Sequence, residues 1–104
     1  MINTKSDLLS AGRLKRATHA VESLGGSELE IIEMDLTTRA ELLRLASDND
    51  NAGVGKLIMR RCVPLLADST DDELNELTPA VFEEVSTLVY RLSGMLGEDD
   101  EKKP

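Results

Sequence analysis

Apolar residues at helical spacing predict that most of this chain is helical. The spacing is clearest over residues 79–93, where a broad apolar stripe is separated from polar positions that face away. Thr78 is placed to cap this helix, Pro79 suits its first position and Gly94 suits its end. The stripe consists of Val81, Phe82, Val85, Leu88, Val89 and Leu92. We expect this to be the longest helix, with a stripe that belongs to the core or is lent in part to a partner helix.

Two more helices are predicted in the middle of the chain. Thr38 and Glu41 have the spacing of a capping box, so we expect a helix from about 39 to 47. A run of turn-forming residues ends it. Apolar positions then recur at helical spacing over residues 54–62, up to Pro64, which stops or kinks the helix. This second helix is the one basic helix of the chain.

Short helices are predicted at two further places. Thr70 and Glu73 form another capping box, which begins a short helix through Leu77. Near the N-terminus we expect about one turn of helix, with Ser6 as its cap and Gly12 at its end.

Residues 14–24 fit two structures. They carry a helical stripe with Gly25 as its C-cap, but Gly25 and Gly26 also form a turn ahead of a strand-like run at 27–35. That run alternates acidic and apolar residues, and an isolated strand cannot satisfy its backbone hydrogen bonds. Because the segment before the glycine pair is the only nearby partner, we predict a β-hairpin over about 15–34. The expected fold is α+β and mainly helical, with this small hairpin packed on about four helices.

The composition fits one small domain with an aliphatic core. The chain has 104 residues, of which 40% are hydrophobic and only 2% aromatic, and this length leaves no room for a second domain. We expect residues 1–96 to form the domain. Residues 97–104 contain no apolar side chain to bury, so we expect them to form a disordered acidic tail.

The charge excludes several classes of partner. Twelve Lys and Arg against twenty Asp and Glu give a net charge of −8, which is the wrong sign for binding nucleic acid or an anionic membrane. We therefore expect neither as a partner. A single cysteine excludes an internal disulfide, and no early apolar run has the length of a signal peptide, so an intracellular protein is expected.

No group of residues points to catalysis, a metal or a cofactor. Residues 53–56 resemble part of a phosphate-binding loop, but Asp50 stands where that motif requires its first glycine and Leu57 replaces the magnesium-binding Ser or Thr. The lone His19 and Cys62 are expected to be a surface histidine and a packed thiol. We predict a protein that is not an enzyme.

Acidic residues are concentrated between positions 68 and 84, where there are seven acids and no bases. A solvated face with helix capping is the simpler explanation, and the alternative is a docking surface for a basic partner. The basic helix of a neighbouring copy could be that partner, which would give a homo-oligomer built head to tail as a ring or an open spiral. The candidate partner-binding residues are Lys56, Arg60, Arg61, Asp71, Asp72, Glu73, Glu76, Glu83 and Glu84.

Several short stretches share their order with a known family. They are LLSAGRLK at 8–15, LGG at 24–26, LEIIEM at 29–34, LTPAVFEEV at 77–85 and LSGM at 92–95. In this order they resemble the tail assembly chaperones encoded by long-tailed, siphovirus-type phages. The resemblance covers most of residues 6–96. It weakens at residues 65–69, where relatives often carry an Asp-x-Gly turn before an aromatic residue.

The resemblance implies a non-catalytic chaperone in the host cytoplasm. Such a protein binds the tape measure protein and keeps it soluble until the tail tube assembles, and a longer frameshifted product recruits the tail tube protein. An acidic, aliphatic helical module is suited to this role because it can cover apolar helix faces while its charge keeps the complex soluble. The alternative is an acidic interaction protein that mimics the charge of DNA or inhibits a basic protein.

Overall fold

The computed structural model of the chain describes residues 1–95, which form five α-helices and one two-stranded antiparallel sheet. This confirms the predicted α+β, mainly helical fold. The predicted domain boundary at 96 and the predicted tail at 97–104 lie outside the described residues. The elements are α1 (Lys5–Ala11), β1 (Arg16–Val21), η1 (Glu22–Leu24), β2 (Ser27–Ile32), α2 (Leu36–Ser47), α3 (Asn51–Cys62), η2 (Pro64–Leu66), α4 (Asp71–Asn75) and α5 (Pro79–Leu92), where η denotes a single 3-10 turn.

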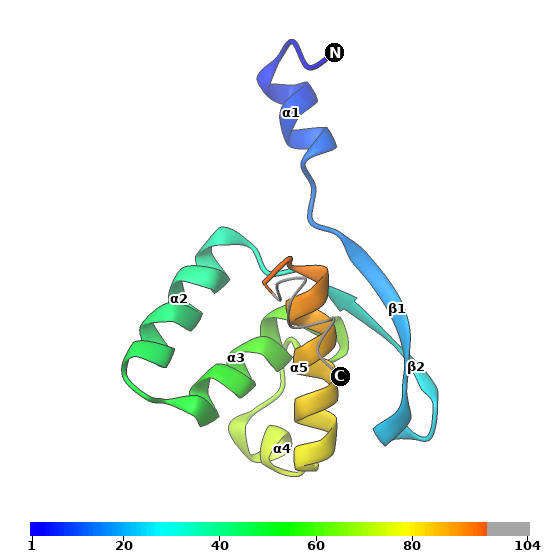
Figure 1. The fold of residues 1–104 in the computed structure, drawn as a ribbon, viewed down its shortest axis with the longest axis vertical. Helices are drawn as coiled ribbons and strands as arrows, with labels where there is room; N and C mark the ends of the chain where they lie inside the picture. The colour runs from blue at the N-terminus through cyan, green and yellow to red at the C-terminus, as the bar shows by residue number, and fades with distance from the viewer. Residues whose placement is uncertain (96–104) are drawn as a thin grey trace, which may run out of the picture.

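Helix α5 lies between the other helices and the hairpin (Figure 1). It contacts α3 on one side and both strands on the other, and α2 packs against α3. Helix α1 stands apart from this body at the N-terminal end and is joined to β1 by an extended segment. The core therefore lies around α5, and α1 contributes nothing to it.

The hairpin spans Arg16–Ile32, within the predicted 15–34, and residues 14–24 do not form the single helix that their periodicity also allowed. Ala17 pairs with Ile31 across the two strands, and Val21 pairs with Ser27 at the end near the turn. Alternate residues face α5, so Val21 and Ile31 are completely buried. Burial of this face requires the extended conformation, and it outweighs the helical periodicity of the first strand.

The connection between the strands is longer than a two-residue glycine turn. The 3-10 turn η1 follows β1, and Gly25 and Gly26 then adopt φ values of 69° and 82°. A side chain is strained at such positive φ values, whereas glycine adopts them freely. The two glycines therefore close the hairpin as expected, although η1 comes before them.

The predicted start of the helix at 39–47 is wrong. Helix α2 begins at Leu36, three residues earlier than expected, because Asp35 caps it by accepting a hydrogen bond of 2.7 Å from the backbone N–H of Thr38. Thr38 is itself buried in the first turn. Glu41 does not complete a capping box and instead pairs with Arg61 on α3 at 3.6 Å. The N-cap of α2 is therefore Asp35 and not Thr38.

Side-chain caps also begin the other helices. Thr4 caps α1, because its hydroxyl oxygen accepts a hydrogen bond of 3.0 Å from the backbone N–H of Asp7. The prediction of Ser6 as the cap is therefore wrong. Ser6 lies inside the first turn. The capping box of Thr70 and Glu73 is present as predicted, and so is the cap of α5 by Thr78.

The core is aliphatic. Its buried side chains are Val21, Ile31, Met34, Leu42, Leu57, Ile58, Met59, Cys62, Val63, Leu74, Val81, Val85 and Val89. On α5 the three valines of the predicted stripe are buried, whereas Phe82, Leu88 and Leu92 are only half-buried. Part of the stripe therefore remains open beside the core.

We expect the Leu74→Ala substitution to lower the free energy of unfolding by about 2–5 kcal/mol, because this leucine is fully buried and its truncation leaves a cavity. The matched control is Leu65→Ala, since Leu65 is 78% exposed, and it should change stability by less than about 0.5 kcal/mol. Chemical denaturation measures both. Equal effects of the two substitutions would contradict the burial of α4 against the core.

Candidate functional site

The basic residues predicted to bind a partner meet an acid of the same chain. Arg60 on α3 donates a hydrogen bond to Asp71 Oδ1 at the start of α4, and its Nε donates to the carbonyl of Ser69 at 2.9 Å. Lys56 Nζ lies 3.9 Å from Asp71 Oδ2. The hydrogen bond from Arg60, followed by the charge of Lys56, holds the pKa of Asp71 below its usual range. These contacts join α3 to the first turn of α4.

The third predicted base also has a partner within the chain. Arg61 lies 3.6 Å from Glu41, and this pair joins α3 to α2. A head-to-tail contact of Lys56, Arg60 and Arg61 with the acidic segment of a neighbour would have to replace these internal pairs. That contact remains a prediction.

Glu84 lies on α5 and binds the connection of the hairpin. Its two carboxylate oxygens accept hydrogen bonds of 2.8 and 2.9 Å from the backbone N–H groups of Glu22 and Ser23 in η1. These bonds, with that from Ser23 foremost, lower the pKa of Glu84. The sequence offered no signal for this role, because the partners are 62 and 61 residues away along the chain.

The remaining acids of the predicted site divide into two groups. Glu73 is used in the capping box of α4. Asp72, Glu76 and Glu83 are exposed, and none of their carboxylates forms an ion pair or a hydrogen bond with any of residues 1–95. These three carboxylates are the part of the predicted acidic surface that is open to a partner.

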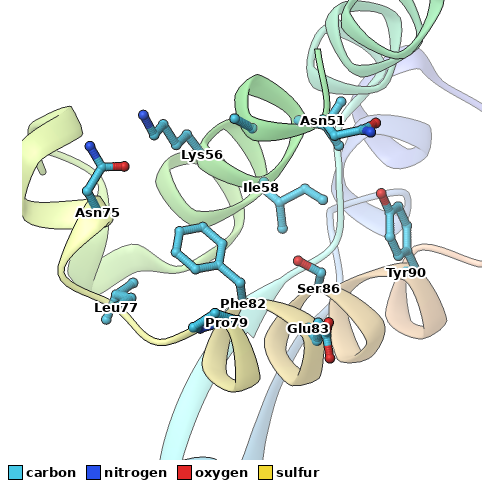
Figure 2. A pocket seen from close by; sticks show the side chains of 13 residues that line it. Asn51, Lys56, Ile58, Asn75, Leu77, Pro79, Phe82, Glu83, Ser86 and Tyr90 are labelled. Atoms are coloured by element: carbon cyan, nitrogen blue, oxygen red, sulfur yellow. The ribbon is translucent and has the colours of Figure 1, made fainter. Parts of the chain in front are cut away.

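An apolar groove runs between α3 and α5, close to α4 (Figure 2). Its cavity volume is about 660 Å³, within the range of sites that bind a peptide side chain or a small molecule. Figure 2 shows Phe82 of α5 pointing toward α3, with Leu77 and Pro79 beside it and Ile58 opposite. Glu83 lies at the edge. We call this hollow the α3–α5 groove.

Gly55 is the residue of α3 that lets Phe82 approach. A Cβ atom at this position would lie 3.3 Å from Cδ1 of the Phe82 ring, closer than ordinary van der Waals contact. In the sequence Gly55 belonged to an incomplete phosphate-loop motif, whereas its structural role is to make room for an aromatic ring. The sequence predicted Phe82 as part of the apolar stripe of the last helix. That it lines a groove could be recognised only once the position of α3 was known.

A second apolar surface lies on the outer side of α2. Leu36, Ala40 and Leu43 recur at helical spacing on one face, which we call the α2 outer face. Leu36 is 84% exposed and Leu43 is 59% exposed. The opposite side of the helix buries Leu42 against the core. Helix α2 is therefore apolar on both its inner and its outer side.

Cys62 is buried and His19 is half-buried. Cys62 is completely buried, as expected for a packed thiol, and burial raises its pKa to about 11. His19 is half-buried on the inner face of the hairpin, opposite Leu29, so the expectation of a surface histidine is only partly met. Over residues 1–95, no three His, Cys, Asp or Glu side chains form a group able to hold a metal ion.

Comparisons with models of protein families, with curated proteins and with solved structures find no match to this chain. None of the described helices combines the length and the apolar character needed to cross a lipid bilayer. Three features of the described residues bear on function: the α3–α5 groove, the α2 outer face and the three open carboxylates.

We expect the hydrogen bonds of Glu84 to make stability depend on pH. A carboxylate whose pKa is lowered by folding stabilises the native state above its unfolded pKa, about 4.3 for glutamate, and loses this contribution as pH falls through the folded pKa. Wild-type protein should therefore lose its stability advantage over Glu84→Gln on acidification below about pH 4. Glu83→Gln is the control, because Glu83 is exposed and makes no such bonds, and it should leave the pH profile of the wild type unchanged. Denaturant melts across this pH range measure the difference.

Cys62 should react with a thiol reagent such as 5,5′-dithiobis-(2-nitrobenzoic acid) only when the protein unfolds. Both its burial and its raised pKa keep the reactive thiolate scarce and out of reach. Labelling in native buffer should be slower by orders of magnitude than labelling in denaturant. Rapid labelling in native buffer would show that the C-terminal end of α3 opens.

Proposed function

We propose that this chain is a non-catalytic tail assembly chaperone of a long-tailed phage, which binds the tape measure protein and keeps it soluble in the host cytoplasm. The sequence resemblance over most of residues 6–96 supports the proposal. The observation that carries it is the α2 outer face, an apolar helical stripe with no partner among residues 1–95. Such a stripe is what one helix needs to pack on another.

The α2 outer face fits an apolar helix of the client. Leu36 and Leu43 lie seven residues apart, so they are two turns apart on the same side of α2. Between them Ala40 is small, which allows a second helix to approach closely. Burying each leucine against a client would contribute about 1.5–3 kcal/mol, which is useful for a reversible contact and too little for a permanent one.

The charge of the chain suits the second part of the proposed role. A tape measure segment exposes apolar stripes before the tube forms around it, and these stripes promote aggregation. A bound domain with a net charge of −8 would cover the stripe on one side and add negative charge on the other. The complex would then repel other copies of itself.

The open carboxylates of Asp72, Glu76 and Glu83 favour a second candidate, an acidic protein that occupies the basic surface of its target in place of DNA. The two functions differ in their response to salt. A contact between charges weakens steeply as ionic strength rises, whereas apolar helix packing changes little. The two exposed leucines of α2 have no role in a charge mimic, and we therefore place the chaperone first.

Coexpression with the tape measure protein of the same phage tests the proposal. Wild-type chain should move the tape measure protein from the pellet to the supernatant, in a complex that survives moderate salt. Leu36→Arg/Leu43→Arg should abolish this effect without unfolding the chain, because both side chains are exposed. Leu65→Arg is the matched control, since Leu65 is equally exposed but lies outside α2. Circular dichroism verifies the fold of each variant.

The outcomes separate the function from the surface assigned to it. If the tape measure protein stays insoluble with the wild-type chain, the chaperone proposal is wrong. If the α2 double variant solubilises it as well as the wild type does, the client binds elsewhere. A complex that forms only at low salt would favour the charge mimic.

A further inference from the structure

The sheet has only two strands, so each strand has an outer edge with no strand beside it among residues 1–95. The surroundings of the two edges differ. Strand β2 also contacts α3 and η2, whereas β1 packs on α5 and lies on the side of the sheet away from α3 (Figure 1). The outer edge of β1 is therefore the more accessible one, and we call it the β1 edge.

The backbone groups of three residues of β1 point away from β2. In an antiparallel pair, the residues that bond to the partner strand alternate with residues that do not. The N–H of Glu33 donates to the carbonyl oxygen of Lys15 at 2.9 Å, so Lys15 and every second residue after it face β2. The N–H and C=O groups of Arg16, Thr18 and Ala20 therefore face outward, and all three residues are exposed.

The β1 edge lacks most of the features that keep a sheet edge from pairing. Proteins commonly block an edge with a bulge, a proline or charged side chains. The pairing of the two strands runs without a bulge, and the corresponding outward positions of β2 carry Glu28 and Glu30. On β1 only Arg16 is charged, and it already pairs with Glu30 at 3.3 Å. Thr18 and Ala20 leave the rest of the edge open to another strand.

A hollow lies beside this edge, between η1 and α5. Its volume is about 680 Å³, and its lining extends along α5 from Ala80 to Arg91. Because η1 directly follows β1 and α5 contacts β1, the hollow adjoins the β1 edge. This length of helix spans about 16 Å, which matches about five residues of an extended strand. We call it the η1–α5 hollow.

The η1–α5 hollow has an apolar centre. Leu88 lines it and is only half-buried, so the core leaves this part of the apolar stripe of α5 open. A third strand beside β1 would place alternate side chains toward α5, on the same face of the sheet as Val21. One of these side chains would cover Leu88. The hollow therefore favours an apolar residue in the middle of the added strand.

The charges of the hollow indicate what else the strand should carry. Glu22 and Glu83 lie toward the η1 end, and neither carboxylate forms an ion pair with any of residues 1–95. Arg91 lies at the other end of the hollow and forms no ion pair within that range either. A base at one end of the strand and an acid at the other would match these side chains.

We propose that the β1 edge binds an extended segment of another protein as a third, antiparallel strand. The backbone of the segment bonds to the outward groups of β1. The side chains that face α5 are, in chain order, a base toward Glu22 and Glu83, an apolar residue on Leu88 and an acid toward Arg91. In this mode of recognition the backbone bonds give affinity and the alternate side chains give specificity. The α2 outer face takes no part in the contact.

A capped synthetic peptide, Thr-Lys-Thr-Val-Thr-Glu-Thr, tests the proposal. When its Lys, Val and Glu face α5, the N–H groups of its threonines face β1. Added at millimolar concentration to the isotope-labelled chain, it should shift the amide NMR signals of Arg16, Thr18 and Ala20. The amides of Ala17 and His19, which face β2, should shift less. A peptide that only filled the hollow would not produce this alternation.

Two methylated peptides test the backbone bonds. Methylation of the nitrogen of a threonine next to the valine removes a donor that faces β1, and it should weaken binding about tenfold. Methylation of the valine nitrogen changes an amide on the opposite edge of the peptide, so it should leave binding within about twofold of the parent peptide. NMR titrations measure both.

Two pairs of variants test the chain itself. Thr18→Pro removes an outward N–H but no bond to β2, and it should abolish binding. Its control, Thr18→Ala, keeps the N–H and should bind as the wild type does. Glu22→Lys/Glu83→Lys should weaken binding about tenfold at low salt. Asp72→Lys/Glu76→Lys makes the same change of charge at exposed positions outside the hollow, so its effect should stay below about threefold.

Three results would overturn the proposal. The first is the absence of the alternating shifts at millimolar peptide. The second is a folded Thr18→Pro variant that binds as the wild type does, and if that variant does not fold, equal binding of the two methylated peptides has the same meaning. The third is a shift of the same amides that grows with the concentration of the chain alone, because the edge would then pair with another copy.

The tape measure protein is absent from these measurements, and the solubility test of the proposed function uses variants of α2 only. The two proposals can therefore fail separately.

Discussion

The fold depends on the contact of the hairpin with α5, because two strands cannot form a stable sheet alone. The contact is apolar along the strands, where Val21 and Ile31 are fully buried. It is polar at both ends of the helix. Near the N-terminal end of α5, Glu84 accepts two backbone hydrogen bonds from η1. At the C-terminal end, the hydroxyl of Ser93 accepts a buried hydrogen bond of 2.9 Å from the backbone N–H of Met34, just after β2.

The same end of α5 also positions α2. Arg39 of α2 donates a hydrogen bond of 2.8 Å to the carbonyl oxygen of Ser93, so one residue joins the hairpin through its hydroxyl and α2 through its backbone. With the hairpin on one side and α3 on the other, α5 has only part of its apolar stripe in the core. Phe82 is left at the junction with α3, where the absence of a side chain at Gly55 allows the ring to lie against the helix. The groove is thus a result of how α5 is shared between its neighbours.

Local signals were sufficient to predict most of the elements from the sequence. The caps at Thr70 and Thr78 depend on residues within one turn, and the structure has both. The start of α2 was missed because Asp35 and Thr38 are both good caps, and only the burial of Thr38 decides between them. The hairpin was predicted from the need of a strand for a partner. Its 3-10 turn was not, because η1 is fixed by a carboxylate far along the chain.

The candidate site was harder to predict for the same physical reason. Sequence shows the sign of a charge but not which charges meet, and the pairs of Arg60 and Arg61 with acids on α4 and α2 exist only once those helices pack. The open carboxylates could be identified only after the paired ones were known. Exposed leucines carry a similar ambiguity, since Leu42 and Leu43 are adjacent in the sequence but only Leu42 is buried. A helix apolar on both sides has no single stripe, so only tertiary packing shows which side is free.

The position of the exposed leucines distinguishes the functions that this chain could have. Acidic residues alone would serve a protein that mimics a nucleic acid, and exposed leucines would then only reduce its solubility. In this chain single exposed leucines occur at positions 14, 24 and 65, but pairs of them occur on two helices, α1 and the outer side of α2, and neither pair is used by the core. The excess of acids over bases in the body offsets the loss of solubility. A domain that exposes leucines on two separate helices and balances them with net charge is suited to bind helices on more than one side, which is what a coat around a long apolar rod requires.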